Sequence, residues 1–310
     1  MVAAAASLGT DVVAAEVAEA LRIAGIRSIL LRGPSIARHV YGKGEFREYF
    51  DVDLLVAPSA MAQAERILAD HGFAHSAVLG QRSDDRPPWS RTWERVSDGG
   101  NVDLHTIIVG VGVEPERLWA LLVEDVEPVK VARARLEGLN TRATAFVIAL
   151  HAAHHGSDVR KPLHDLARAI ERFPQPTWEA AAALAERLAA TSAFAAGLRL
   201  IPAGAELAYR LQLRNDASAE VMLRAGGAPP MALGFEWLTH VPGFRAKARL
   251  VAGKVVPDTE FMRAWSPLAR RGRVGLAAAY GLRVLWLAWH AIPGLLAWSR
   301  AHKSARYPRR

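Results

Sequence analysis

The feature that most constrains the fold of this chain is the six-residue run 51–56, which reads Asp-Val-Asp-Leu-Leu-Val. Its apolar character predicts a buried strand. Because side chains alternate between the two faces of a strand, Asp51 and Asp53 point to one face and the alternate apolar residues point to the other. Two adjacent carboxylates repel each other unless a cation lies between them, and Mg²⁺ carrying phosphates is the commonest such cation. A solvated strand end is the alternative.

Length and composition limit the kinds of protein that the chain can be. With 310 residues it is long enough for two domains, or for one domain with a large extension. The absence of cysteine excludes disulfides, thiolate chemistry and cysteine-based zinc sites. Residues 1–9 lack the cationic start and the long apolar core of a signal peptide. A cytoplasmic protein is therefore expected.

The positive charge is concentrated at the C-terminal end. Residues 241–310 hold 14 Lys or Arg but only two acidic residues, a net charge of +12, whereas residues 1–240 carry a net charge of −4. A basic segment of this kind favours an acidic partner, such as nucleic acid, anionic lipid or a charged protein. A solvated helical face is the alternative.

The order of the predicted elements indicates an α+β protein. Strands are predicted at 27–31, 51–56, 73–78, 92–97 and 101–108, and helices at 11–24, 35–41 and 58–71. From Pro115 onward the pattern is almost entirely helical, with helices at 141–155, 163–172, 178–190 and 192–200. We therefore expect an α/β domain at 1–114, a helical domain at 115–240 and a basic helical extension at 241–310.

The first predicted strand ends in Arg32-Gly33-Pro34-Ser35, and Pro34 suits the first position of a helix. A glycine turn that leads into a helix offers backbone N–H groups and the positive end of the helix dipole to a phosphate. The Ser35 hydroxyl and the Arg32 guanidinium would add further donors. An ordinary helix cap is the alternative.

A third carboxylate follows on the last predicted strand. Asp103 lies on the same strand face as Asn101 and His105. There it would complete a site for two metal ions, which together stabilise the attacking and leaving oxygens of a displacement. Asp103 would also activate the acceptor hydroxyl. His105 would orient a carboxylate or contact substrate, or make a structural hydrogen bond.

Several short motifs occur in a set order. They are Leu30-Leu31-Arg32-Gly33-Pro34-Ser35, the run 51–56, Gly72-Phe73, Val102-Asp103-Leu104-His105, Leu150-His151-Ala152-Ala153-His154-His155, Leu163-His164-Asp165-Leu166-Ala167 and Gly197-Leu198-Arg199-Leu200. In this order the chain resembles the uncharacterised nucleotidyltransferases of the DNA polymerase β superfamily over about residues 20–210. Those proteins typically read Leu-Lys-Gly, then Asp-Ile-Asp-Leu-Leu-Val, then an acid followed by Leu-His.

The resemblance implies a small mixed-sheet nucleotidyltransferase domain of the polymerase β type, followed by a helical domain. It also implies transfer of a nucleoside monophosphate from an NTP, most simply ATP, to an unidentified small molecule, peptide or RNA, with Mg²⁺ or Mn²⁺ as the cofactor. Asp51, Asp53 and Asp103 would be the metal ligands, with Asp103 also the general base. Two departures stand out: Arg32 replaces the usual Lys, and the gap from Gly33 to Asp51 exceeds that of antibiotic-modifying members.

Other basic residues are candidates for nucleotide contacts. Arg47, in the loop before Asp51, would reach a triphosphate or be a plain surface charge. His151, with His154 or His155, would face a cleft and contact the nucleotide, or lie hydrogen-bonded in the core. These histidines with His164-Asp165 also suggest a His-Asp metal phosphohydrolase. That chemistry needs a further Asp and wider spacing, and neither is evident.

Residues 276–298 form a long apolar stretch that Arg283, His290 and Pro293-Gly294 interrupt. We expect a helix packed on the core of the protein, with a helix in a membrane interface or a membrane-spanning helix as the alternatives. Two other functions stay open: a non-catalytic nucleotide-binding protein whose basic tail recruits nucleic acid or membrane, and a nucleotidyltransferase-type toxin that acts on tRNA or protein.

Overall fold

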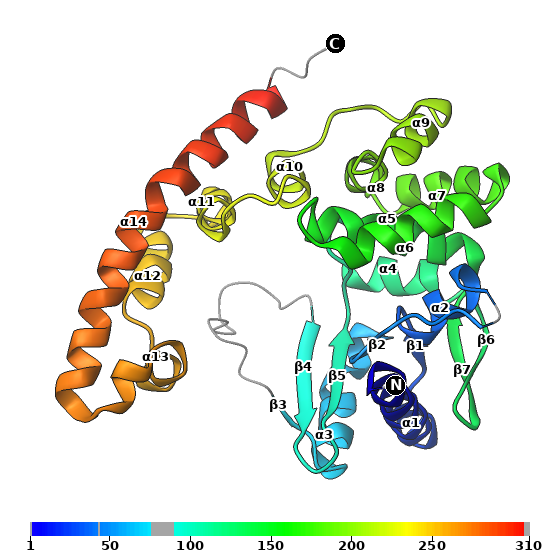
Figure 1. Ribbon diagram of the computed structural model, residues 1–310, viewed down its shortest axis with the longest axis horizontal. Helices are drawn as coiled ribbons and strands as arrows, with labels where there is room; N and C mark the ends of the chain where they lie inside the picture. Colours follow the sequence, from blue (N-terminus) through cyan, green and yellow to red (C-terminus); the bar gives the residue numbers. More distant parts are fainter. Residues whose placement is uncertain (1, 43, 76–89, 307–310) are drawn as a thin grey trace. The chain divides into compact units, whose positions relative to one another are not determined.

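The computed structural model describes residues 2–42, 44–75 and 90–306 (Figure 1). These residues form two compact units. The first unit comprises the residues up to 75 together with 90–215, and the second begins at residue 216. The first unit contains the sheet and all the acidic motifs discussed above.

One mixed sheet of seven strands organises the first unit. Its strands, in spatial order, are β3 (Ala74–His75), β4 (Ser90–Arg95), β5 (Gly100–His105), β2 (Val52–Val56), β1 (Ser28–Leu30), β7 (Ala134–Leu139) and β6 (Val126–Val131). The β2–β5 and β1–β7 pairs are parallel, and the other neighbours are antiparallel. The α+β class and the mixed sheet predicted from the sequence are thereby confirmed.

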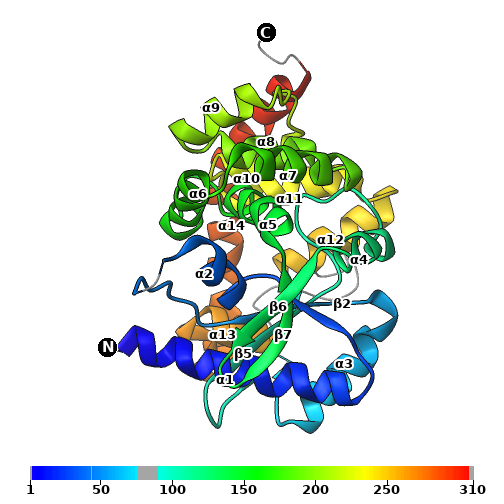
Figure 2. The same cartoon turned by 90° about the vertical axis from the view of Figure 1, so that its right-hand side faces the viewer.

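The two faces of the central strands have different roles. Val52, Leu54 and Val56 of β2 are buried in one apolar core with Val102 and Leu104 of β5. Side chains of α1 (Val2–Ile23) and α3 (Met61–Asp70) complete this core. In Figures 1 and 2 these two helices lie on one side of the sheet, opposite α5 to α9. The predicted alternation along 51–56 is therefore correct, and the other face of β2 and β5 carries Asp53, Asp103 and His105.

Local chemistry sets several element boundaries. The helix α2 (Pro34–Val40) begins at Pro34, whose missing N–H costs nothing in the first turn of a helix. Strand β2 begins at Val52, so that Asp51 directly precedes it. The predicted turn 98–100 joins β4 to β5, and Gly99 adopts φ 72°, a conformation that glycine tolerates without strain.

The prediction of an almost entirely helical chain after Pro115 is wrong for 126–139. These residues form the β6–β7 hairpin, which extends the sheet beyond β1. Val129, Val131 and Leu136 are buried, whereas Lys130 and Arg135 are exposed, as strand alternation requires. The hairpin turns at Ala132, with φ 48°, and has no Asn-Gly or Asp-Gly signal to reveal it in the sequence.

The rest of the first unit is helical. After a short 3₁₀ turn, η1 (Pro58–Ala60), and α3, its helices are α4 (Pro115–Leu122), α5 (Thr141–His155), α6 (Arg160–Arg172), α7 (Gln175–Arg187), α8 (Thr191–Leu198) and α9 (Pro202–Arg210). Helix α5 is buried almost all round by its neighbours, and Phe146 stacks on Phe194 of α8. A Cβ at Gly197 would meet the Ala149 carbonyl oxygen at 1.9 Å, so only glycine allows α8 to approach α5 this closely.

The second unit is entirely helical in the part that the structure describes. It contains α10 (Ala219–Ala225), α11 (Pro230–His240), α12 (Phe244–Val255), α13 (Thr259–Trp265), the 3₁₀ turn η2 (Pro267–Arg270) and α14 (Gly272–Arg306). The apolar stretch 276–298 lies within α14. Within residues 2–42, 44–75 and 90–306, no helix combines the length and the apolar content that a membrane crossing requires.

Candidate active site

The polar face of the central strands gathers three of the predicted side chains. The parallel register pairs Asp53 of β2 with Asp103 of β5, and His105 lies two residues further along β5. One ligand atom from each of these residues lies within 4.8 Å of the other two. Two carboxylates and an imidazole held this closely on neighbouring strands are able to hold a metal ion.

Asp53 is the centre of this group. Its carboxylate is almost fully buried, and it accepts hydrogen bonds from Arg32 Nε at 2.8 Å and from His105 Nε2 at 3.0 Å. Arg32 Nε binds Oδ2 of Asp53, whereas Arg32 Nη2 donates to Oδ1, the oxygen that His105 also contacts. Burial alone would raise the pKa of Asp53, but the Arg32 charge and the His105 hydrogen bond outweigh it and hold that pKa far below the usual range. Asp53 is therefore ionised at every physiological pH.

Asp51 and Asp103 have more open surroundings. Asp51 directly precedes β2 and is half-buried. Burial, and then the charge of Asp53, raise the pKa of Asp51 above its usual value. The Asp103 carboxylate accepts a hydrogen bond from the Thr92 hydroxyl at 2.6 Å. The three predicted carboxylates thus differ: one is locked in place, and two are reachable from solvent.

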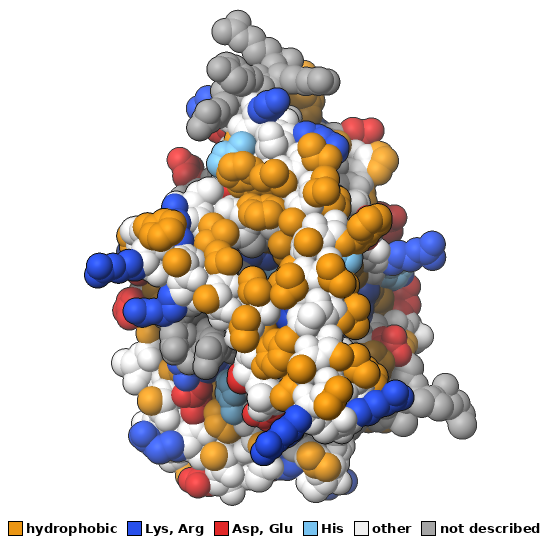
Figure 3. Space-filling view, turned by 90° about the vertical axis from the view of Figure 1, so that its left-hand side faces the viewer, with side chains coloured by type: hydrophobic (Ala, Val, Ile, Leu, Met, Phe, Trp, Pro, Cys, Tyr) orange, Lys and Arg blue, Asp and Glu red, His pale blue; other side chains and the backbone are white. Residues whose placement is uncertain are grey.

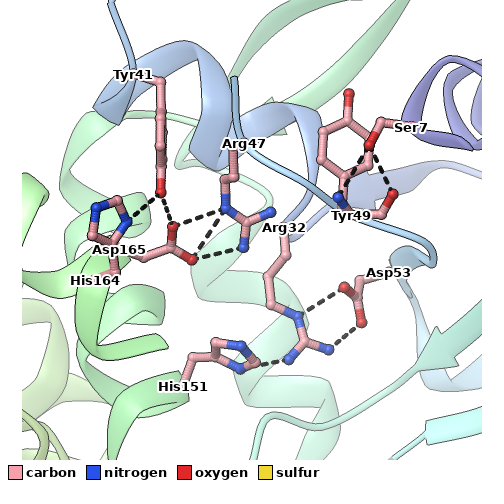
Figure 4. Close-up of polar contacts among 9 residues, drawn as sticks. All are labelled: Ser7, Arg32, Tyr41, Arg47, Tyr49, Asp53, His151, His164 and Asp165. Atoms are coloured by element: carbon pink, nitrogen blue, oxygen red, sulfur yellow. Dashed lines mark hydrogen bonds and ion pairs between the residues drawn. The ribbon is translucent and has the colours of Figure 1, made fainter. Parts of the chain in front are cut away.

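Arg32 joins the sheet to the helices (Figure 4). Its guanidinium holds Asp53 on one side, while its Nη1 lies 2.8 Å from Nδ1 of His151 on α5. Because a guanidinium only donates, His151 Nδ1 accepts and the ring is neutral. Burial and the Arg32 charge lower the pKa of His151 well below its usual value, in agreement with that state.

The first turn of α2 encloses the Ser35 hydroxyl within the protein. Gly33 precedes α2 with φ 61°, and a Cβ there would lie 3.5 Å from the Tyr49 ring. The Ser35 side chain is fully buried, and its Oγ lies 3.3 Å from the position of a Cβ on Gly138 of β7. Among the described residues this hydroxyl has no hydrogen-bond partner. The Ser35 hydroxyl is therefore not exposed to a ligand in this conformation.

Arg47 lies in a buried ion pair. Its Nη2 contacts Asp165 of α6 at 2.7 Å, and only 4% and 1% of the two side chains are exposed. The Tyr41 hydroxyl donates to the same carboxylate at 2.7 Å and lies 3.1 Å from His164 Nδ1 (Figure 4). This network fastens the segment before β2 to α6. Asp165 of the His164-Asp165 motif therefore pairs with Arg47, which lies 118 residues away in the sequence.

The remaining basic residues lie in the last turns of α5 and at the start of α6. The His155 ring lies 4.5 Å from that of His151 and 4.9 Å from that of His154, between ring centroids. Burial and the Arg32 charge lower the pKa of His155. Lys161, at the start of α6, was not predicted as a site residue, although its charge offsets a small part of the rise in the pKa of Asp51. Nothing in its local sequence separates it from an ordinary surface lysine.

The geometry agrees with the family match. A family model described as "Uncharacterised nucleotidyltransferase" matches residues 3–203, almost two thirds of the chain, and the chain belongs to this family. The predicted family is thereby confirmed, and with it nucleotidyl transfer as the general activity. The match covers the sheet, the acidic motifs and helices α4 to α8.

Comparisons with individual proteins add little. None of the curated proteins matches the chain. The solution structure of the antibiotic-resistance factor ANT(2'')-Ia is 13% identical over 58% of this chain and 93% of that one, with a TM-score of 0.42. The crystal structure of the lincosamide antibiotic adenylyltransferase LnuA with lincomycin is 14% identical over 49% and 91%, with a TM-score of 0.33. Likenesses this distant carry no argument about the acceptor.

Proposed function

We propose that this chain transfers a nucleoside monophosphate from an NTP, with ATP as the expected donor, to an acceptor hydroxyl, and releases pyrophosphate. The observation that carries the proposal is the β2–β5 register, which sets Asp53 beside Asp103 in a member of a nucleotidyltransferase family. Asp51 enters β2 next to them. The acceptor is a small molecule, a peptide or an RNA.

The donor atoms of this site suit a divalent cation. Asp51, Asp53 and Asp103 supply carboxylate oxygens, the ligands that Mg²⁺ and Mn²⁺ prefer. We assign these three residues as the metal ligands. His105 has a positioning role, because its Nε2 must donate to the ionised Asp53. A bound Mg²⁺ or Mn²⁺ would stabilise the negative charge on the reacting phosphates.

Asp103 is the proposed general base. Its carboxylate is partly exposed, and the Thr92 hydroxyl fixes its orientation. It would take the proton from the acceptor hydroxyl as that oxygen bonds to the α-phosphorus of the NTP. The bond from the α-phosphorus to the pyrophosphate oxygen then breaks, and pyrophosphate leaves.

Arg32 is the proposed phosphate ligand. Three hydrogen bonds, two to Asp53 and one to His151, use three of its five N–H donors. The other two are available for phosphate oxygens, and 20% of the side chain is exposed. His151 would hold the guanidinium in this orientation. Arg47, which Asp165 already binds, and the buried Ser35 receive no ligand role in this proposal.

The first test is the Asp53→Asn variant. ATP labelled at the α-phosphate is incubated with pools of small molecules, peptides and RNA, and both labelled product and pyrophosphate are measured. We expect at least about a hundredfold loss of both in Asp53→Asn, and loss of the wild-type activity in a chelator with recovery on adding Mg²⁺.

Asp70→Asn is the matched control, because Asp70 is exposed at the end of α3 and outside the site. Calorimetric titration of each protein with ATP and Mg²⁺ separates lost binding from lost chemistry. Full turnover by Asp53→Asn would contradict the proposal.

A further inference from the structure

Helix α14 carries an apolar surface that the described fold leaves uncovered. The surface follows one line along the helix at spacings of three and four residues, through Ala278. We call it the outer stripe: Val274, Leu282, Leu285, Trp289, Ile292 and Leu296. Between 50% and 83% of each of these residues is exposed. Figure 3 shows hydrophobic side chains gathered along this face of the molecule. Isolated exposed apolar residues need no explanation, but a continuous stripe of them marks an interaction site.

The opposite side of α14 is packed, which fixes the direction of the outer stripe. A Cβ at Gly275 would lie 2.3 Å from the Leu268 carbonyl oxygen, and one at Gly294 would lie 2.6 Å from Met231 Cβ. Further along the same side, Ala279 and Ala301 are buried. The helix is thus apolar on both sides, and among the residues that the structure describes only one side packs against the rest of the second unit.

Charge is excluded from the outer stripe and placed at its ends. Between Val274 and Leu296 the only charged side chain is Arg283, which is buried on the packed side and donates to the Lys254 carbonyl oxygen. Continued at the same spacing, the stripe reaches Arg271 at one end and Arg300 and Lys303 at the other, all exposed. The segment 241–310 as a whole carries a net charge of +12.

We propose that the outer stripe docks on an anionic lipid surface, with α14 lying in the membrane interface rather than crossing it. The 22 helical steps from Val274 to Leu296 give a contact line of about 33 Å. Its apolar residues would enter the boundary of the acyl chains, while the basic residues at its ends would meet anionic headgroups. An exposed tryptophan, Trp289, is typical of such an interface.

Two other occupants fit less well. A second copy of the chain would bring another segment of net charge +12 to the same surface, and the two would repel each other. Nucleic acid is bound mainly through cations that contact phosphates, and the stripe itself holds none between its ends. Charge and apolarity together therefore favour anionic lipid. This proposal is independent of the proposed chemistry in the first unit.

The test is a vesicle flotation assay with the full chain. Vesicles of phosphatidylcholine alone are compared with vesicles that contain about one third phosphatidylserine. We expect binding to the anionic vesicles, weaker binding at about 0.5 M salt, and a blue shift of tryptophan emission on binding. The combined variant Leu285→Ser, Trp289→Ser and Ile292→Ser should partition at least about tenfold less.

Matched variants separate the apolar and the charged contributions. Tyr209→Ser, which removes a side chain 85% exposed in the first unit, should bind vesicles like the wild type. Arg300→Gln combined with Lys303→Gln should lower binding to anionic vesicles by about fivefold for each charge. Circular dichroism of each variant checks that it is folded, and Trp289→Ser alone replaces the combined variant if that variant unfolds.

Four outcomes would overturn the proposal. One is a wild-type chain that does not float with anionic vesicles at low salt. Another is a combined variant that is folded and still binds anionic vesicles with the affinity of the wild type. The third is a wild-type dimer seen by light scattering and lost in the combined variant, without vesicle binding, which would assign the stripe to a second copy. Binding of a single-stranded RNA probe without vesicle binding would likewise assign the basic residues to nucleic acid.

Discussion

The two units of this protein differ in the surface that each offers to a ligand. The first unit buries ionised side chains and pairs each of them, as in the Arg47–Asp165 and Arg32–Asp53 contacts. The second unit keeps its exposed helix face apolar and leaves Leu285 and Trp289 70% and 79% exposed. Burying a charge costs desolvation free energy, and leaving an apolar side chain exposed loses the stabilisation that its burial would contribute.

The difference corresponds to the kind of ligand proposed for each unit. Paired charges around Asp53 fix the positions of side chains before a charged substrate arrives, as a site for phosphates requires. The outer stripe on α14 needs no such fixed geometry. Its binding to lipid would depend on the apolar area removed from water, and the hydrophobic effect has no preferred direction. The following variants test this contrast, beginning with the largest expected effect.

Asp165→Ala should cause the largest loss of stability. It leaves the Arg47 guanidinium buried with no carboxylate, and removal of one partner from a buried pair costs about 3–5 kcal/mol. Urea unfolding followed by circular dichroism measures the change. The control is the double variant Arg47→Met with Asp165→Leu, which removes both charges and should recover much of the loss. A double variant as unstable as the single one would show that packing, and not charge, accounts for the effect.

His151→Gln should change how stability depends on pH. The pKa of His151 is lowered in the folded protein, so this residue costs no stability above its unfolded pKa of about 6.5 and an increasing amount as the pH falls below that value. Between about pH 7.5 and pH 5.5, the substitution should remove about 1.4 kcal/mol of the wild-type decrease in unfolding free energy.

Urea unfolding of both proteins at the two pH values measures this change. Part of the decrease should persist in His151→Gln, because the pKa of His155 is lowered as well. An unchanged pH dependence would mean that His151 titrates alike in the folded and unfolded chains, and that its neutral state does not depend on Arg32.

Leu285→Ala should have the smallest effect, within about 0.5 kcal/mol, because the side chain is 70% exposed. Its matched control is Leu198→Ala in α8, where the same truncation removes a fully buried side chain and should cost about 2–5 kcal/mol. Thermal unfolding compares the two. A large loss in Leu285→Ala would show that the face of α14 is covered within the chain, and the contrast between the units would fail.

The sequence predicts local features of this fold well. The alternation in 51–56, the helix start at Pro34 and the turn before β5 depend on neighbouring residues, and all three are found. Asp103 could be linked to the run 51–56 because both lie in strands, and the parallel register then sets it beside Asp53. These predictions succeed because the chemistry that determines them is close in the sequence.

Features that depend on distant residues could not be predicted in this way. The sequence around Arg47 does not show whether its side chain contacts a phosphate or Asp165. The contact with Asp165 forms because α6 packs beside the segment that carries Arg47. Ser35 is buried where Gly138 of the β6–β7 hairpin packs against it, and no Asn-Gly or Asp-Gly turn marks that hairpin in the sequence. The link from Arg32 to His151 likewise depends on the position of α5.

Arg283 has a consequence for the rotational setting of α14. Its guanidinium lies over the rings of Phe261 and Trp265 and donates two hydrogen bonds to the Lys254 carbonyl oxygen, in the last turn of α12. A cation there also complements the negative end of the α12 dipole. Because each residue turns a helix by about 100°, the anchoring of this side chain and the close packing at Gly275 and Gly294 together set which residues of α14 point outward. Arg283 therefore helps to orient the outer stripe, although it lies on the packed side of the helix.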